Sequence, residues 1–197
     1  MLKYDEYQKK VAHFGHDLGK RDNISHSVLG MMSEVGELRE LTVLSSEGIP
    51  SLAWVEELGD CFWFAAWYAT AMGKSFTAAM ELSFSVPPEQ LNDVREALDH
   101  LEMAGCALLS YVKKHLFYKT EDFDYLGMNE EYLTYLKTLS HLALLTQSIH
   151  QFSIEDILDA NFNKLDARYK GKGFSSDHAV NRDTQKEYEA MESSDGC

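Results

Sequence analysis

The chain has 197 residues, of which 45% are hydrophobic and 25% charged, so it can fold around a core of its own. Its 18 basic and 32 acidic residues give a net charge of −14, which disfavours binding to nucleic acid or to anionic membrane surfaces. With 3 prolines and 12 glycines, few residues interrupt regular structure, and this favours a mostly helical protein.

Apolar residues at helical spacing predict two helices in the first part of the chain. The first covers residues 4–18. The second covers residues 23–44, and either Asn23 or Ser25 supplies its N-cap. The intervals between the apolar residues place one face of each helix in a shared core.

The third predicted helix, residues 51–72, starts at Ser51 as a cap. It is apolar on nearly every face after Asp60, so we expect it at the centre of a bundle. A short helical stretch within residues 73–87 ends at a Val-Pro-Pro boundary. Three longer helices follow, at residues 88–117, 128–149 and 153–169, the last capped by Ser153.

No segment alternates with a period of two over a convincing length, so we expect an all-α helical bundle. Residues 1–170 form one domain, and the polar tail, residues 171–197, wraps the surface. The N-terminal segment lacks the apolar core of a secretory signal, and the longest apolar run, residues 61–72, is too short to span a bilayer. The three cysteines have no metal-ligand spacing, so we expect reduced thiols in a cytoplasmic protein.

Two pairs of acidic residues stand at helical spacing within otherwise apolar segments. Glu34 and Glu37 are three residues apart, and so are Glu57 and Asp60. On a helix this spacing brings both side chains to one face. Two adjacent antiparallel helices would then gather four carboxylates, and residues 38–56 are long enough to make the turn.

Four clustered carboxylates in a partly buried site need a counter-charge. A hard divalent cation supplies it, and ligation by oxygen alone favours Mg²⁺, with Mn²⁺ as a substitute. Mg²⁺ held by carboxylates typically keeps waters and reaches substrate phosphates. The acidic pairs therefore predict a magnesium site suited to the hydrolysis of a phosphoanhydride.

Other interpretations of these residues stay open at this stage. Paired acids on a helix are usually a solvated face. A di-iron bundle requires Glu followed three residues later by His on two helices, and the chain has no such pair. An HD-type phosphohydrolase would use His16 and Asp17, but the only His upstream of them is His13, one turn away.

The segments around the acids resemble the all-α nucleoside triphosphate pyrophosphatases, the MazG-like family. Residues 25–41 are similar to the family's His-x-x-x-Gly-x-x-x-Glu-x-x-Glu helix, and residues 56–64 to its Glu-Glu-x-Gly-Asp-x-x-Trp helix. Residues 161–174 resemble its closing motif, Asn-x-x-Lys-Leu-x-x-Arg-Tyr. Residues 178–189 resemble the tail of versions common in bacteria and phages. The similar blocks are scattered over most of the chain apart from residues 74–94.

The resemblance implies Mg²⁺-dependent cleavage of a nucleoside triphosphate, an NTP or a dNTP, to the monophosphate and pyrophosphate. It implies metal ligation by four acids, Glu34, Glu37, Glu57 and Asp60. Of these, Glu37 or Glu57 would also be catalytic by orienting or deprotonating the attacking water. The resemblance further implies substrate contacts, with Lys164 and Arg168 near the triphosphate and His26 and Asn161 near the nucleoside. Each of these four also has a purely structural interpretation, as an ion-pair or packing residue.

Residues 106–133 resemble the stretch that follows the first acidic motif in phage-type members. Alignment on the Lys113–Lys114 pair places the metal-binding glutamates on Ala104 and Ala107. Alignment on Glu130 and Glu131 likewise places the metal-binding aspartate on Thr134. The second copy has therefore lost its acids and kept basic and aromatic residues.

These alignments predict a fused pseudo-dimer. Residues 23–73 form the metal-binding helix pair, and residues 95–149 form a degenerate second pair. Three lysines of the second region, Lys113, Lys114 and Lys119, would reach the substrate phosphates. The alternative is that residues 88–149 are a helical insertion whose lysines are surface charges.

Two function hypotheses follow from the sequence. The first is a cytoplasmic pyrophosphohydrolase that controls or cleans a nucleotide pool. The second is a non-catalytic nucleotide-binding or regulatory bundle of the same fold. Both leave open the preferred base and sugar, and whether the chain acts as a monomer or a homo-oligomer. Aromatic candidates for a base pocket are Trp54, Trp63, Phe64, Trp67 and Tyr118.

Overall fold

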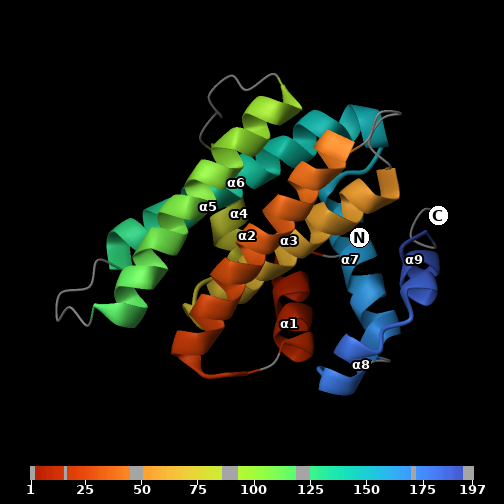
Figure 1. Ribbon diagram of the computed structural model, residues 1–197, viewed down its shortest axis with the longest axis horizontal. Coiled ribbons are helices and arrows are strands. Elements are labelled where there is room, and N and C mark those ends of the chain that lie inside the picture. Colours follow the sequence, from red (N-terminus) through yellow and green to blue (C-terminus); the bar gives the residue numbers. More distant parts are fainter. Residues whose placement is uncertain are drawn as a thin grey trace.

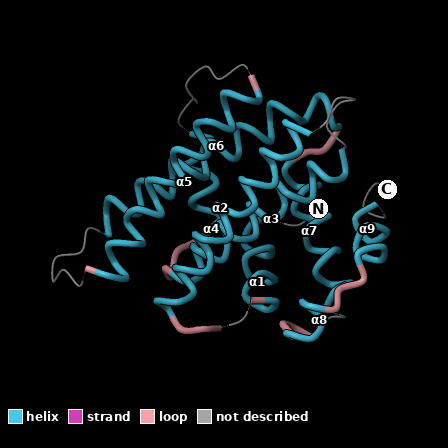
Figure 2. Tube along the Cα trace, in the orientation of Figure 1, coloured by secondary structure: helices cyan, strands magenta, loops and turns pink. Residues whose placement is uncertain are grey.

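The computed structural model describes residues 3–15, 17–44, 51–85, 93–118, 125–169 and 172–192. Every regular element in these ranges is an α-helix (Figure 2). The helices are α1 (Tyr4–Phe14), α2 (Lys20–Leu44), α3 (Ser51–Ala71), α4 (Phe76–Ser85), α5 (Val94–Phe117), α6 (Tyr125–His150), α7 (Ile154–Tyr169), α8 (Ser176–Val180) and α9 (Thr184–Glu192). The expected all-α class is confirmed, and no described helix is long and apolar enough to cross a membrane.

Two long helical hairpins, α2–α3 and α5–α6, form the body of the molecule (Figure 1). They pack side by side, so that α2 lies against α5 and α3 lies against α6. Arg21 near the start of α2 donates to Leu116 O near the end of α5 at 2.8 Å. Arg39 in the second half of α2 donates to Glu102 near the start of α5, also at 2.8 Å. The two helices therefore run antiparallel.

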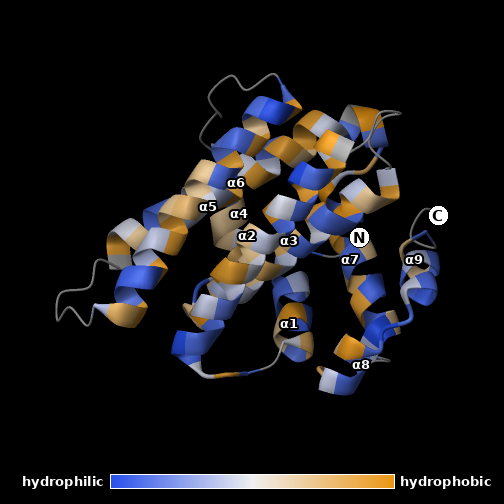
Figure 3. Ribbon diagram, in the orientation of Figure 1, coloured by the Kyte–Doolittle hydropathy of each residue, from blue (hydrophilic) through white to orange (hydrophobic). Residues whose placement is uncertain are grey.

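The helices α3 and α6 are antiparallel as well. The indole of Trp54 donates to Thr146 at 3.0 Å, and the hydroxyl of Tyr132 donates to Ala65 O at 3.0 Å. The expected central position of α3 is confirmed, because side chains all along it, such as Phe62, are fully buried. Burying each such large side chain contributes about 1.5–3 kcal/mol. Hydrophobic and hydrophilic residues alternate along the turns of the long helices (Figure 3), as expected for a bundle.

The start of α2 differs from the prediction. This helix begins at Lys20, so Asn23 and Ser25 lie inside it and neither is the N-cap. Asn23 instead accepts from the backbone N–H of Leu18 at 3.0 Å, which ties the preceding turn to the helix. Gly19 has a φ of 84° in that turn, a conformation that other residues adopt only with strain. The helix α1 ends at Phe14 and not at residue 18, because Gly15 already has extended backbone dihedrals.

The other helix starts were predicted with mixed success. The cap at Ser153 is confirmed, since its hydroxyl accepts from Asp156 N at 3.1 Å. Ser51 is the first residue of α3, and its hydroxyl is 2.9 Å from His150 Nδ1. The helix expected from residue 88 begins at Val94, where Asp93 is the N-cap. The Val-Pro-Pro boundary lies outside the described residues.

The segment after α7 is more ordered than predicted, because it contains α8 and α9. Both helices pack against α7, on the side of the molecule away from α5 (Figure 1). Met191 of α9 is only 1% exposed, and Ser175 caps α8 by accepting from His178 N. The segment therefore forms a wall beside α7, and it was missed because its apolar residues are few and widely spaced.

Candidate metal centre and adjoining cavity

Two glycines allow α2, α3 and α7 to approach closely. A Cβ added at Gly30 of α2 would lie 2.3 Å from the ring of Phe64 in α3. A Cβ added at Gly59 of α3 would lie 2.8 Å from Cβ of Asn161 in α7. Any larger residue at either position would separate these helices. The close packing brings polar side chains from all three helices to one place.

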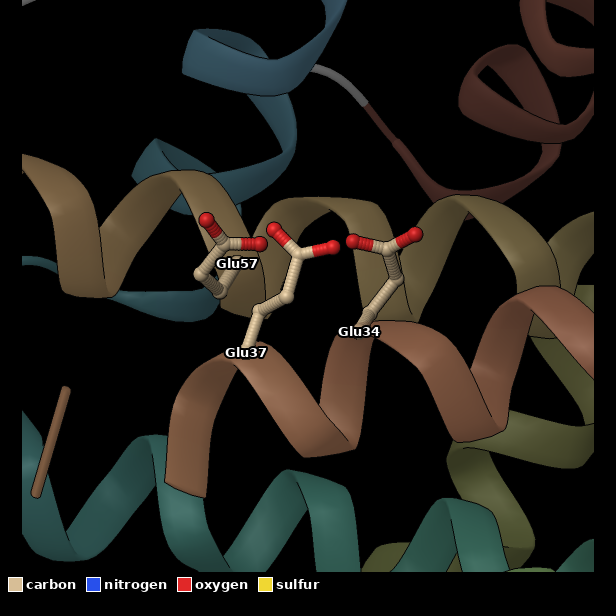
Figure 4. Close-up of side chains that lie close together, drawn as sticks. All are labelled: Glu34, Glu37 and Glu57. Carbon is tan, nitrogen blue, oxygen red and sulfur yellow. The ribbon is translucent and has the colours of Figure 1, made fainter. Parts of the chain in front are cut away.

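Three carboxylates meet between α2 and α3. Glu34 and Glu37 extend from α2 and Glu57 extends from α3, and their carboxyl groups point toward one another (Figure 4). One oxygen from each of the three lies within 4.8 Å of the others. The predicted convergence of the two acidic segments is therefore present for these three residues.

The carboxyl groups of this cluster are hard to ionise together. Burial, reinforced by the charge of Asp60, raises the pKa of Glu57 to about 9 and that of Glu34 to about 7. Burial and Asp60 also raise the pKa of Glu37, against the opposing effect of Arg182. The charges of Glu37 and Glu34 further raise the pKa of Glu57, so the three acids resist ionising together in the absence of a cation.

Asp60 lies beside this cluster but is engaged from the other side. Its Oδ1 accepts from Asn161 Nδ2 at 2.7 Å, and its Oδ2 accepts from Lys164 Nζ at 2.5 Å. Each carboxylate oxygen has a second lone pair, so these bonds leave Asp60 able to bind a cation as well. Its ligand role stays a prediction, while the structure gives it a second role as the anchor of α7.

Lys164 and Asn161 lie behind the acids and not in the open cavity. The side chain of Lys164 is 0% exposed and also forms an ion pair with Glu56 at 3.4 Å. Burial disfavours its charged form, but Asp60 and Glu56 outweigh this effect and raise its pKa. Asn161, 1% exposed, accepts from the hydroxyl of Tyr7 at 2.8 Å. As placed here, both residues orient carboxylates, and neither contacts the cavity directly.

A cavity of about 520 Å³ opens between the α2–α3 hairpin and the segment formed by α7, α8 and α9. Its acidic end carries Glu34, Glu37, Glu56, Glu57 and Asp60. Its other walls are largely aromatic and contain Phe14, Trp63, Phe64, Tyr169, Phe174 and Tyr188. An acidic end beside aromatic walls can hold a cation together with a flat ring.

Arg168 lines the cavity but is already paired. Its guanidinium donates to both carboxylate oxygens of Glu187 in α9, at 2.9 and 2.7 Å. Burial alone would disfavour the charge, but the two bonds and the charge of Glu187 outweigh it and raise the pKa of Arg168. This bidentate pair fastens α9 to α7.

The remaining predicted substrate residues are dispersed. His26 lines the cavity, and its ring meets that of Phe64 edge-on at a centroid distance of 5.5 Å. Lys113 and Lys114 are exposed on α5, and neither is among the described residues that line the cavity. The reason is that α5 lies on the other side of α2 from α7 and α9 (Figure 1). Lys119 lies outside the described residues.

Two of the five aromatic candidates, Trp63 and Phe64, line the cavity. Trp54 and Trp67 are buried in the core, while Tyr118 is 62% exposed just after α5. The core aromatics fill space between helices, so they contribute to stability and not to binding.

Among the cavity residues that the sequence did not single out are Glu56, Arg182, Glu187 and Tyr188. Glu56 directly precedes a predicted ligand, which was its available signal. The other three belong to the tail, where no helix was expected. Their side chains reach the cavity only because α9 folds back along α7.

Comparison of the chain with known proteins adds no relative: no family model, no curated protein and no solved structure matches it.

Proposed function

We propose that the chain is a Mg²⁺-dependent nucleoside triphosphate pyrophosphohydrolase that acts on a cytoplasmic nucleotide pool. The observation that carries the proposal is the convergence of Glu34, Glu37 and Glu57 at one end of a cavity with aromatic walls. The resemblance of the same segments to the MazG-like family supports it. The charge of the protein disfavours long polyanions but is compatible with a small nucleotide bound together with cations.

The donor set suits a hard divalent cation. It offers carboxylate oxygens only, and the pKa values of Glu34 and Glu57 are raised by burial and by the charge of Asp60, both of which a bound cation would offset. Glu34, Glu37 and Glu57 would hold Mg²⁺, with Asp60 beside them, and Mn²⁺ would serve as a substitute. When bound, Mg²⁺ supplies charge neutralisation at the phosphate oxygens that water attacks.

Side chains of the protein would supply proton acceptance, cation binding and the positioning of the acids. The side chain of Glu37 is exposed to the cavity, which makes it the better placed of the two catalytic candidates to accept a proton from water. Glu57 is less exposed and suits the binding of the cation. Lys164 and Asn161 fix Asp60, so the acids keep their spacing when the substrate enters.

The aromatic walls provide the means to hold a base. Phe64, Trp63 and Phe174 line the cavity beyond the acids, and stacking on one such ring contributes about 1–3 kcal/mol per base. Stacking tolerates every base, so the walls support a nucleotide without selecting one.

The arrangement of the hairpins supports the pseudo-dimer. In a two-fold dimer the same helix from each subunit can pack against its own copy in the antiparallel direction. Here α2 is antiparallel to α5 and α3 to α6, the pairs that the sequence alignments equate. The internal repeat is thus part of the proposal, with the full set of four acids retained in one copy only.

The test is the release of pyrophosphate from a panel of NTPs and dNTPs with Mg²⁺. We expect release from at least one nucleotide, and a loss of about a hundredfold or more in E37Q. The matched control is E40Q, one turn along the same helix, which we expect to stay within about threefold of wild type. Binding of nucleotides without release would instead support the non-catalytic bundle. Equal turnover by E37Q and E40Q would overturn the proposal.

A further inference from the structure

The cavity contains far more negative than positive side chains. Six acids line it, namely Glu34, Glu37, Glu56, Glu57, Asp60 and Glu187, against two arginines, Arg168 and Arg182. A triphosphate is itself strongly anionic, so its binding requires protein cations in addition to divalent metal. The question is which cation is available to it.

Two of the nearby cations are already neutralised. Arg168 is held by both oxygens of Glu187, and the buried ammonium of Lys164 lies between Asp60 and Glu56. A phosphate could recruit either cation only by displacing a carboxylate, which would leave that acid partly buried and unpaired. Both groups are therefore better suited to holding the structure together.

Arg182 differs from both. It lines the cavity, its side chain is exposed, and it forms no ion pair or hydrogen bond within the part of the chain that the structure describes. Its charge acts on Glu37 and on Tyr188, which places it near the acidic end of the cavity. It is thus a guanidinium facing the place where phosphates would lie.

The backbone that carries Arg182 is fixed at both ends. The residue lies between α8 and α9, where Asn181 N donates to Asp177 O at 2.8 Å. On the other side Glu187 is bonded to Arg168 and Met191 is buried. Arg182 is therefore presented to the cavity by anchored helices, which reduces the entropy lost when it binds a ligand.

We propose that Arg182 binds the phosphate chain of the nucleotide, and that the α8–α9 segment is for this reason a wall of the active site. This inference rests on the proposed function. The guanidinium donates paired hydrogen bonds to phosphate oxygens that the divalent cations leave exposed, without displacing any carboxylate. It recognises the polyphosphate and not the base, so its effect is the same for every nucleotide.

The variants that test the proposal are R182A and R182K, with K186A as the matched control. Lys186 is on the same segment, but its ion pair with Asp183 is exposed and it is absent from the described lining of the cavity. Two quantities are measured: KM and kcat for the best nucleotide of the panel, and the affinity for inorganic tripolyphosphate with Mn²⁺. The second quantity does not depend on turnover.

We expect R182A to raise KM and to weaken tripolyphosphate binding by at least about tenfold, with a smaller effect on kcat. R182K should recover part of both losses, whereas K186A should match wild type within about twofold. Unchanged KM and unchanged tripolyphosphate affinity in R182A would overturn the proposal, and so would an equal loss in K186A. If wild type releases no pyrophosphate, the proposed function fails and tripolyphosphate affinity alone decides the role of Arg182.

Discussion

The two helical hairpins are similar in length but differ in the acidic residues that they carry at equivalent positions. The helices α2 and α3 have 25 and 21 residues, and α5 and α6 have 24 and 26. The first hairpin places three carboxylates within 4.8 Å of one another. At three of the four positions that the alignments equate with metal-binding acids, the second has Ala104, which is 6% exposed, the half-buried Ala107, and Thr134, and at the fourth it retains Glu131. Thr134 uses its hydroxyl to bond its own helix, by donating to Glu130 O.

What separates the hairpins is the presence of a third helix with a counter-charge. α7 packs along α3 and places Lys164 against Asp60 and Glu56. Buried residues of α5, such as Leu101 and Leu108, are apolar, and the contacts of α5 with α2 include the ion pairs of Arg39 with Glu102 and Asp99. Partly buried acids are costly without compensation, so the site depends on α7 as much as on its own acids.

The largest expected effect compares equivalent glutamates of the two hairpins. The alignments equate Glu57 with Glu131, so E57Q and E131Q make the same chemical change in the two copies. We expect E57Q to reduce pyrophosphate release by about a hundredfold or more, because it removes an acid of the cluster. E131Q should stay within about twofold of wild type. Similar losses in the two variants would show that both hairpins serve the reaction.

The second prediction concerns the counter-charge. K164M should lower the free energy of unfolding by about 3 kcal/mol, because it leaves two acids without their buried partner. For a protein of this size that corresponds to a fall in Tm of about 6–12 °C. The control K186M removes an exposed ion pair and should shift Tm by about 1–2 °C at most. Thermal unfolding followed by circular dichroism measures both, and a stable K164M would remove α7 from the explanation.

A third prediction separates the aromatic walls from the acidic end. F174A removes a cavity ring and should raise KM for nucleotides about fivefold to tenfold, without changing the affinity for tripolyphosphate. Phe117, 72% exposed on α5, supplies the control F117A. Steady-state kinetics and tripolyphosphate titration distinguish the two effects. If F174A weakens both ligands equally, the ring supports the site and does not bind the base.

A fourth prediction concerns stability as a function of pH in EDTA. The pKa values of Glu34 and Glu57, about 7 and about 9, lie above the ordinary value of 4.5. The folded state therefore binds more protons than the unfolded state between about pH 4.5 and about pH 9. Stability is therefore fully present below about pH 4.5 and falls as pH rises through about 7 and about 9. Tm in E34Q/E57Q should change less with pH, and the variant should be more stable than wild type at pH 9. A less stable variant at pH 9 would contradict the assigned repulsion.

The sequence contained enough information for the acids but not for their surroundings. Glu34, Glu37 and Glu57 could be found because a spacing of three on adjacent helices is a local pattern. The contacts of Lys164 could not be predicted, because a motif specifies a residue type but not the direction of its side chain. Arg182 lies in residues 178–189, the segment that resembles the family's tail, but its place at the cavity depends on how α9 returns along α7, a long-range contact with no signal in local spacing.

The same contrast holds for the fold. The long helices and the central position of α3 followed from apolar spacing. The start of α2 did not follow from the sequence. Asn23 is a residue type that often caps helices, but here its side chain binds the preceding turn. The lysines of the second hairpin were expected at the site, but α5 packs on the side of α2 that faces away from α7 and α9. A repeat in the sequence does not reveal on which side of α2 its second copy packs.

The most direct test of the central claim, that one hairpin alone carries a divalent metal site, is calorimetric titration with Mn²⁺. It compares wild type, the triple variant E34Q/E37Q/E57Q, and the second-hairpin variant E130Q/E131Q. We predict that the triple variant loses the tight binding of Mn²⁺ and that E130Q/E131Q retains it in full. Tight binding that survives in the triple variant, or that is lost in E130Q/E131Q, would contradict the account.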